Sequence, residues 1–245
     1  MRSVFSNHLD VGFDGIDPIL GYARNVVNIY FVEVGPNSLW RVPTLVSCSS
    51  FSLSLSLLSQ YIPRAIHTAE QMRKLGADRY IWMTQSWIIS LYLDCPPHMG
   101  LQCPSADDQA ALRKAIAAGD ITYHAYPFNA ELEFMEPSLL SFGFEMTHAL
   151  DDALGVPRKT VMSQRDVPGS TRAAVPLLVA NGVHAISFGV TGFSAPPAMP
   201  RAFVWSDPAS KTSVIGMYHA GGYGGIDAAD AVVVPALSSA LIMDW

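Results

Sequence analysis

The stretch Thr160–Val190, TVMSQRDVPGSTRAAVPLLVANGVHAISFGV, contains a complete succession of strand, helix and strand. Thr160–Gln164 favours a strand. Ser170–Asn181 favours a helix that stops at Gly182, because glycine readily adopts the positive φ found just after helix ends. Val183–Val190 is strand-like again. This succession predicts a βαβ unit, in which the two strands lie parallel in one sheet.

The same alternation runs through the chain before this stretch. Apolar residues recur at helical spacing up to Leu75, and Gly76 follows them as an end signal. Ser105 and Asp108 have the spacing of a capping box at a helix start. Helices are therefore expected over Ile62–Leu75, about Asp107–Gly119 and Pro137–Leu154, and strands over Arg79–Thr84 and Ile121–Ala125. The pattern predicts an α/β protein whose functional groups gather where parallel strands end.

Composition narrows the class of protein. The chain has 245 residues, half of them hydrophobic, which suits one domain or part of a larger one. The formal net charge is −6, and Lys and Arg form no block along the sequence. A surface that neutralises phosphates is therefore not indicated, and nucleic acid is not expected as a partner. No transmembrane segment or signal peptide is visible, and the compartment and oligomeric state stay open.

The three cysteines give no metal or redox motif. Cys48, Cys95 and Cys103 include no C-x-x-C pair of the kind found in zinc ribbons and disulfide oxidoreductases. A disulfide between Cys95 and Cys103 is one alternative, and free thiols are the other.

The segment 34–60 interrupts the alternation of strands and helices. It includes Cys48–Gln60, CSSFSLSLSLLSQ, a run of low complexity. One interpretation is a Ser/Leu strand, which would be an aggregation-prone edge if it stayed unpaired. The interpretation we favour is a translated intron. Ser, Leu and Phe can all be encoded by pyrimidine-only codons, and the end of an intron is rich in pyrimidines. Its removal would join Glu33 directly to Tyr61, so 34–60 is expected to be an insert within the domain.

A candidate metal site begins near the N-terminus. In Val4–Asp10, VFSNHLD, His8 and Asp10 are two residues apart on an expected strand, so both side chains emerge on one face. Imidazole and carboxylate groups both bind zinc, and a catalytic zinc normally has three protein ligands. Asp166, at an expected strand end, is the third candidate. The alternatives are a solvated or core His8 and an Asp166 that only forms a turn or a helix cap.

The segment Val161–Gly189 resembles the aspartate-centred part of glycoside hydrolase family 38, the α-mannosidase type. Tyr80–Trp87, YIWMTQSW, resembles the second-strand segment of that family. The resemblance implies a parallel (β/α)7-type barrel over residues 1–245, incomplete at its C-terminus. It also implies one zinc ion on His8, Asp10 and Asp166, with Asp166 as the nucleophile of a retaining glycosidase acting on a carbohydrate or glycoconjugate. Asp166 is followed here by VPGS rather than by the family's usual continuation, so mannose specificity is not carried over.

Further residues are assigned with an alternative beside each. His219 ends an apolar strand before a glycine-rich loop and is a candidate fourth zinc ligand, although the family's own fourth ligand comes from a later region. Packing alone is the other explanation for the aromatic residues near the site. Sugar-binding candidates are Trp87, His124, Asn129 and Tyr223, and guesses for the general acid are Glu131, Glu133 and Asp207.

Two other functions compete with the glycosidase hypothesis. A zinc-dependent polysaccharide deacetylase would use the metal to activate water, but its H-x-x-x-H ligand pair is absent from the sequence. An inactive carbohydrate-binding remnant is the second alternative, because the chain ends before the region in which the family places its acid and last metal ligand.

Overall fold

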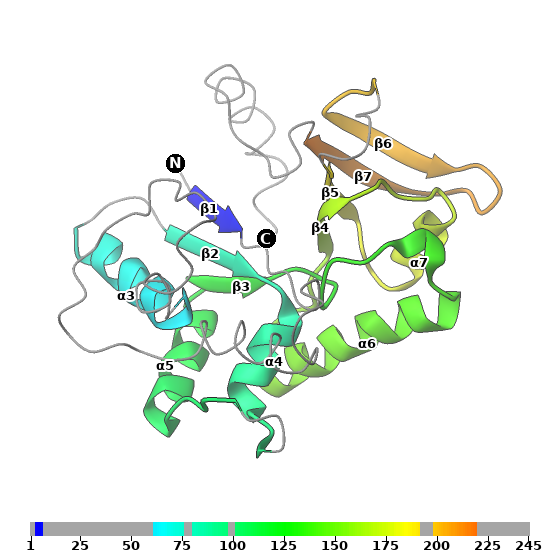
Figure 1. Ribbon diagram of the computed structural model, residues 1–245. Coiled ribbons are helices and arrows are strands. Elements are labelled where there is room, and N and C mark those ends of the chain that lie inside the picture. The colour runs from blue at the N-terminus through cyan, green and yellow to red at the C-terminus, as the bar shows by residue number, and fades with distance from the viewer. Residues whose placement is uncertain (1–2, 7–60, 76–79, 98–100, 192–197, 220–245) are drawn as a thin grey trace, which may run out of the picture. The chain divides into compact units, whose positions relative to one another are not determined.

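The computed structural model describes residues 3–6, 61–75, 80–97, 101–191 and 198–219, and Figure 1 shows their helices and strands. These residues belong to two compact units. The first unit is formed by Met1–Thr84 and Ile88–Thr122, and the second by Gln85–Trp87 and Tyr123–Trp245.

The first unit contains a three-stranded sheet in the order β1-β2-β3. The strands are β1 (Ser3–Ser6), β2 (Tyr80–Thr84) and β3 (Ile121–Tyr123), whose last residue falls in the second unit. β1 and β2 are parallel. The helices are α3 (Tyr61–Lys74), α5 (Ala106–Ala117) and α4 (Ser86–Asp94), whose first two residues fall in the second unit. α3 packs against both α5 and β2. The sequence predicted β2, β3, α3 and α5 to within a few residues, but it gave no bounds for α4.

The start of α5 confirms the predicted capping box. The Ser105 hydroxyl accepts the backbone N–H of Asp108 at 3.2 Å, and the Asp108 carboxylate accepts the backbone N–H of Ser105 at 3.1 Å. This exchange satisfies two N–H groups that the helix itself leaves without an acceptor.

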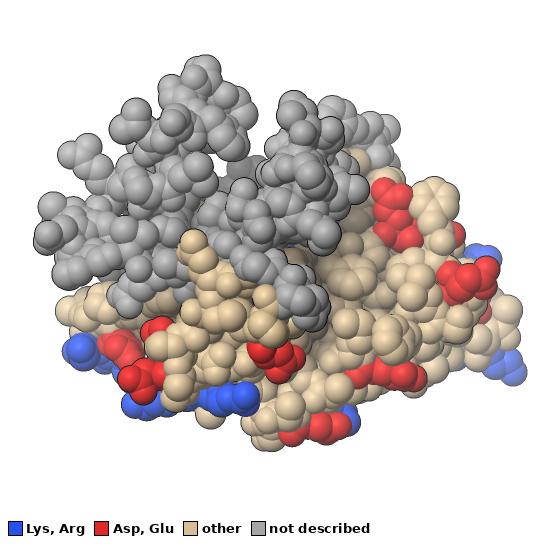
Figure 2. Space-filling model, turned by 60° about the horizontal axis from the view of Figure 1, so that its bottom comes forward, with Lys and Arg blue, Asp and Glu red and all other residues tan. Residues whose placement is uncertain are grey.

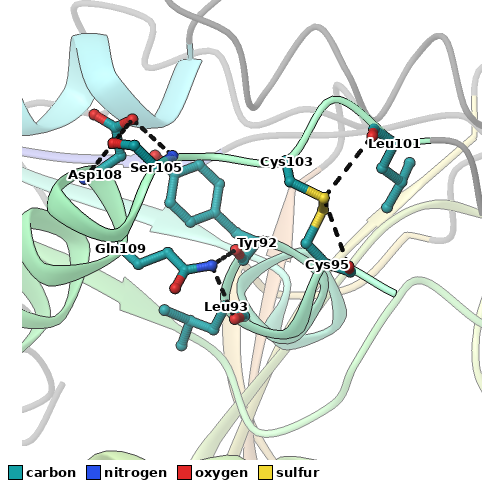
Figure 3. The surroundings of a disulfide bond; sticks show 8 residues. All are labelled: Tyr92, Leu93, Cys95, Leu101, Cys103, Ser105, Asp108 and Gln109. Carbon is teal, nitrogen blue, oxygen red and sulfur yellow. Dashed lines mark hydrogen bonds between the residues drawn. A yellow bond between two sulfur atoms is a disulfide. The ribbon is translucent and has the colours of Figure 1, made fainter. Parts of the chain in front are cut away.

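A disulfide joins Cys95 to Cys103 across the connection between α4 and α5 (Figure 3). The side-chain amide of Gln109, on α5, donates to the carbonyls of Tyr92 and Leu93 at the end of α4, at 3.3 and 3.1 Å. The Cys103 sulfur lies 3.5 Å from the Cys95 carbonyl oxygen, but it carries no proton once oxidised, so this is a van der Waals contact. The oxidised alternative for these two cysteines is the one the structure contains.

The second unit contains a four-stranded sheet in the order β4-β5-β7-β6. β4 (Val161–Val167), β5 (Ala185–Val190) and β7 (Thr212–His219) are parallel, as predicted. β6 (Ala202–Asp207) is antiparallel to β7, with which it forms a hairpin that the sequence analysis did not foresee. The helices of this unit are α6 (Pro137–Leu154), α7 (Ala174–Ala180) and the short 3-10 helix η2 (Leu132–Phe134) (Figure 1).

The two faces of this sheet differ in chemistry because side chains alternate along each strand. One face is apolar and packs with α6 and α7 in the core of the unit, where Met162 and Ile186 are fully buried. The opposite face is mixed. Besides Ala185, Ile215 and Met217 it carries four polar residues, Ser163, Arg165, Ser187 and His219, which follow the register of β4, β5 and β7.

Three boundaries differ from the sequence prediction. β3 ends at Tyr123 rather than Ala125, and β4 continues past Gln164 to Val167 because it stays paired with β5. α7 begins at Ala174 rather than Ser170, because single turns precede it, with the Ala174 N–H bonded to the Thr171 carbonyl at 3.0 Å. The described strands form the two sheets given above, and the seven-stranded barrel remains a prediction.

The surface agrees with the charge pattern of the sequence. On the face shown in Figure 2, the described residues are mostly uncharged, and acidic and basic side chains are scattered in small groups. No helix within the described ranges is long and apolar enough to cross a membrane.

Candidate functional site

The candidate site lies at the carboxyl edge of β4, β5 and β7, in the second unit. Asp166 is the extra residue of a bulge in β4. Arg165 pairs with Gly189, and Val167 pairs with the next residue of β5, Val190, so Asp166 has no partner in the register. Asp166 has φ 57°, in the left-handed region that side chains other than glycine seldom adopt. Bulges and left-handed residues of this kind cluster at functional sites, where they redirect a side chain.

The side chains of Arg165, Ser187 and His219 form one hydrogen-bonded group. An Arg165 Nη2 proton is donated to the Ser187 hydroxyl at 2.8 Å, and this hydroxyl lies 3.1 Å from His219 Nε2. The register places Gly189 between Arg165 and His219, in the same row and on the same face. Neighbouring strands are about 4.8 Å apart, so the backbones of Arg165 and His219 lie roughly 10 Å from each other. With no side chain at Gly189, both can reach the hydroxyl of Ser187.

The Arg165 guanidinium is largely removed from solvent and has no counter-charge within the described residues. One Nη1 proton is donated to the Gln164 carbonyl at 3.1 Å. Nε is buried and has no hydrogen-bond acceptor. Burial lowers the pKa of Arg165 to about 10, and no acidic neighbour raises it again. A buried charge is costly unless it is paired, so burial of this guanidinium is unfavourable among the described residues alone.

Two histidines near this arginine are neutral at physiological pH. Burial, with the positive charges of Arg165 and Arg201, lowers the pKa of His219 to about 4. Burial and Arg165 lower the pKa of His124 to about 3. His124 is only 5% exposed, and its Nδ1 accepts the backbone N–H of Tyr126 at 3.3 Å. Both imidazoles therefore act as hydrogen-bonding groups rather than as cations.

The segment after β3 is fastened to the end of β4. The Asn129 side-chain oxygen accepts the backbone N–H of Arg165 at 3.1 Å. Gln164 accepts the backbone N–H of Ala130 at 2.6 Å and donates to the Phe128 carbonyl at 3.0 Å. Asn129 thus positions the strand end that carries Arg165 and Asp166. The sugar contacts predicted for Asn129 and His124 stay predictions.

Trp87 is held in the same unit, partly buried at the start of α4. Its indole N–H donates to the Gln85 side-chain oxygen at 2.7 Å, and its backbone N–H reaches the Pro127 carbonyl at 3.4 Å. The sugar-binding assignment of Trp87 stays a prediction. His8, Asp10 and Tyr223 lie outside the described residues, so their proposed roles stay predictions as well.

The three guesses for the general acid fall at different places. Asp207 pairs with Thr212, at the start of β7, so it lies at the opposite end of the sheet from His219. There Asp207 belongs to the turn between β6 and β7, where its Oδ2 accepts the Ser210 N–H at 2.9 Å. Its Oδ1 lies 3.6 Å from Arg172 Nε. Asp207 as the acid is therefore wrong. Glu131 and Glu133 are exposed, next to the segment that Gln164 holds.

The described zinc candidates have suitable chemistry. Asp166 offers a carboxylate and His219 a neutral imidazole, on strands that both flank β5. Because Ser187 lies against Nε2 of His219, Nδ1 is the nitrogen left for a metal. No group of three metal-binding side chains occurs among the described residues, to which His8 and Asp10 do not belong.

Arg165 and Ser187 were given no role in the sequence analysis. The available signal was the presence of serines in two buried strands, Ser163 after Met162 and Ser187 between Ile186 and Phe188, since these serines are 3% and 4% exposed. That pattern indicates a polar sheet face, but only the register brings Arg165, Ser187 and His219 together.

The sequence matches no protein-family profile and no curated protein. Among solved structures, an alpha-mannosidase from Enterococcus faecalis V583 is similar over 75% of this chain and 21% of its own, with a TM-score of 0.48 and 16% identity. A glycosyl hydrolase family 38 protein from Enterococcus faecalis is similar over 75% of this chain and 20% of its own, with a TM-score of 0.43 and 13% identity. A 4-alpha-glucanotransferase from Thermococcus litoralis is similar over 62% of this chain and 23% of its own, with a TM-score of 0.43 and 12% identity. The chain therefore spans about a fifth of the length of these proteins.

Proposed function

We propose that this chain acts in a zinc-dependent glycoside hydrolase with a retaining mechanism, in which Asp166 is both nucleophile and zinc ligand. The observation that carries the proposal is the left-handed bulge at Asp166, which sets a carboxylate at the carboxyl edge of a parallel sheet beside a group of polar side chains. This edge is where α/β enzymes place their reacting groups.

The proposed chemistry uses Asp166 to attack the anomeric carbon of the sugar. A covalent glycosyl ester forms as the bond to the leaving oxygen breaks, and water later hydrolyses that ester. A second carboxylic acid gives a proton to the leaving oxygen and then takes one from the water. Zinc bound to His8, Asp10 and Asp166, with His219 as a further ligand, would supply a Lewis acid that holds sugar hydroxyls.

The position of the acid follows from the geometry of retaining enzymes. Their two carboxyl groups lie about 5–5.5 Å apart. Asp207 is at the wrong end of the sheet for this distance, which leaves Glu131 and Glu133 of the earlier guesses.

Metal content and turnover test the proposal together. Zinc is measured by elemental analysis in the wild type, His8→Ala and Asp166→Ala, and each protein is assayed with a panel of 4-nitrophenyl glycosides. Near-stoichiometric zinc that both substitutions abolish, with turnover lost in Asp166→Ala, is expected. Asp207→Asn is the matched control, since it removes a carboxylate at the far end of the same sheet, and it should keep its zinc. A folded wild type without zinc and without turnover would instead identify a non-catalytic remnant.

A further inference from the structure

The geometry points to an acidic substrate: the guanidinium of Arg165, fixed by Ser187 at the carboxyl edge of β4, β5 and β7, binds a carboxylate group carried by the sugar. This guanidinium has no counter-charge among the described residues. The assignment deepens the proposed function, on which it rests for the reaction performed at this edge. The binding of the acid itself does not depend on zinc or on turnover.

The first argument is the charge balance around Arg165. A buried or partly buried arginine in a folded protein is normally paired with a carboxylate, because an unpaired charge loses its hydration without replacement. Arg165 forms no ion pair among the described residues, and its Nε is buried without an acceptor. Its neighbours at hydrogen-bond distance, the Gln164 carbonyl and the Ser187 hydroxyl, are neutral acceptors. An anionic ligand would supply the missing charge.

The second argument is that the side chain is held in place without being neutralised. Ser187 fixes one Nη2 proton, Gln164 fixes one Nη1 proton, and Asn129 holds the backbone N–H of the same residue. A guanidinium has five N–H donors, so Nη1 and Nη2 of Arg165 each keep one proton that no described residue accepts. Two such protons on one planar group form a fork that matches the two oxygens of a carboxylate in a bidentate pair.

The third argument is the kind of anion that the side chain suits. A single planar fork with one serine suits a carboxylate better than a phosphate, whose three oxygens usually require more donors.

His219 can support either a metal or the anion, depending on its tautomer. If the Ser187 hydroxyl donates to Nε2, Nδ1 carries the proton and becomes a second donor to the carboxylate. If Nε2 donates to Ser187 instead, Nδ1 is bare and can bind zinc. The binding test is therefore run both with chelator and with added zinc.

The experiment is isothermal titration of the full chain with D-glucuronate and D-mannuronate, compared with D-glucose and D-mannose as neutral counterparts. We expect saturable binding of at least one uronate, with its neutral counterpart weaker by at least tenfold. Arg165→Gln should weaken uronate binding at least tenfold and leave the neutral sugar unaffected. Arg165→Lys, which keeps the charge but loses the fork, should fall in between. Arg113→Gln, an exposed arginine on α5, is the control for a general loss of positive charge and should bind as wild type does.

Several outcomes would overturn the assignment. Equal affinity for uronates and neutral sugars, or undiminished uronate binding by a folded Arg165→Gln, would refute it. Tighter binding of glucose 6-phosphate than of either uronate would replace the carboxylate by a phosphate. If Arg165→Gln does not fold by circular dichroism, the Arg165→Lys protein decides, since wild-type affinity there would contradict a fork. A protein that binds uronates through Arg165 but contains no zinc and hydrolyses no glycoside would retain this inference while refuting the proposed function.

Discussion

Replacing Gly143 by alanine is expected to destabilise the second unit by about 1–2 kcal/mol. Gly143 lies in the middle of α6, and a methyl group there would be 2.5 Å from the Cε2, Cζ and hydroxyl atoms of Tyr126. This is about 1 Å closer than the optimal contact between carbon atoms. Tyr126 is fully buried and makes edge contacts with Phe144 and Phe128, with ring centroids 4.9 and 5.6 Å away. The ring therefore cannot withdraw without disturbing the core.

The magnitude follows from two opposing effects. Overpacking a core costs about 1–3 kcal/mol. Alanine is favoured over glycine inside a helix by about 1 kcal/mol. Because three atoms of a buried ring are in conflict, we expect the upper part of the overpacking range and a net loss of about 1–2 kcal/mol. For a unit of this size the midpoint of thermal unfolding should fall by about 4–8 °C.

Thermal and urea unfolding followed by circular dichroism measure this change. Glu145→Ala, at an exposed position of the same helix, is the control and should stay within about 0.5 kcal/mol of wild type. In a Tyr126→Leu background the obstructing ring is gone, so adding Gly143→Ala should cost nothing further, which a double-mutant cycle would detect. A Gly143→Ala protein that melts at or above the wild-type temperature would refute the packing argument.

Two further predictions concern a buried carboxylate and a helix cap. Asp151 is 0% exposed and accepts the Tyr123 hydroxyl at 2.8 Å, and burial raises the pKa of its carboxyl group. The carboxyl group of Asp151 therefore contributes fully to the free energy of unfolding below its unfolded pKa, and this contribution is lost as the pH rises through its higher folded pKa. Asparagine does not titrate, so Asp151→Asn should gain stability relative to wild type between pH 4 and pH 7 in urea titrations. An unchanged difference at the two pH values would contradict this. Ser105→Ala removes the side-chain half of the capping box on α5 and should cost about 1 kcal/mol in the same assay, whereas a loss near zero would mean that the cap is replaced by water.

The elements with local signals were predictable from the sequence. α6 begins and ends where predicted, at Pro137 and Leu154, because proline suits the first helical turn and Gly155 adopts φ 63° after the last. The start of α5 followed in the same way from Ser105 and Asp108. In these cases the residues that fix a boundary lie within one helical turn of it.

Features that depend on pairing between distant segments were not predictable. The bulge at Asp166 exists because β4 remains paired with β5 beyond Gln164, and no local pattern encodes that pairing. The link from Arg165 through Ser187 to His219 joins residues on three strands, and it required the strand order and the register. The polar residues at the ends of predicted strands therefore identified the edge of the sheet that holds the site. They did not identify Arg165 as the charged side chain at that edge.

The three linked side chains of this edge all stand on strands. Their mutual spacing is set by the repeat of the sheet, so it is independent of how long the connections between the strands are. Insertions or exchanges after Val167 or Val190 could then alter which molecules gain access while the arginine, serine and histidine keep their separation. In a scaffold of this kind the residues of the sheet recognise the charge of a ligand, and the loops recognise its shape. Directed evolution could therefore diversify the loops without changing the residues of the sheet.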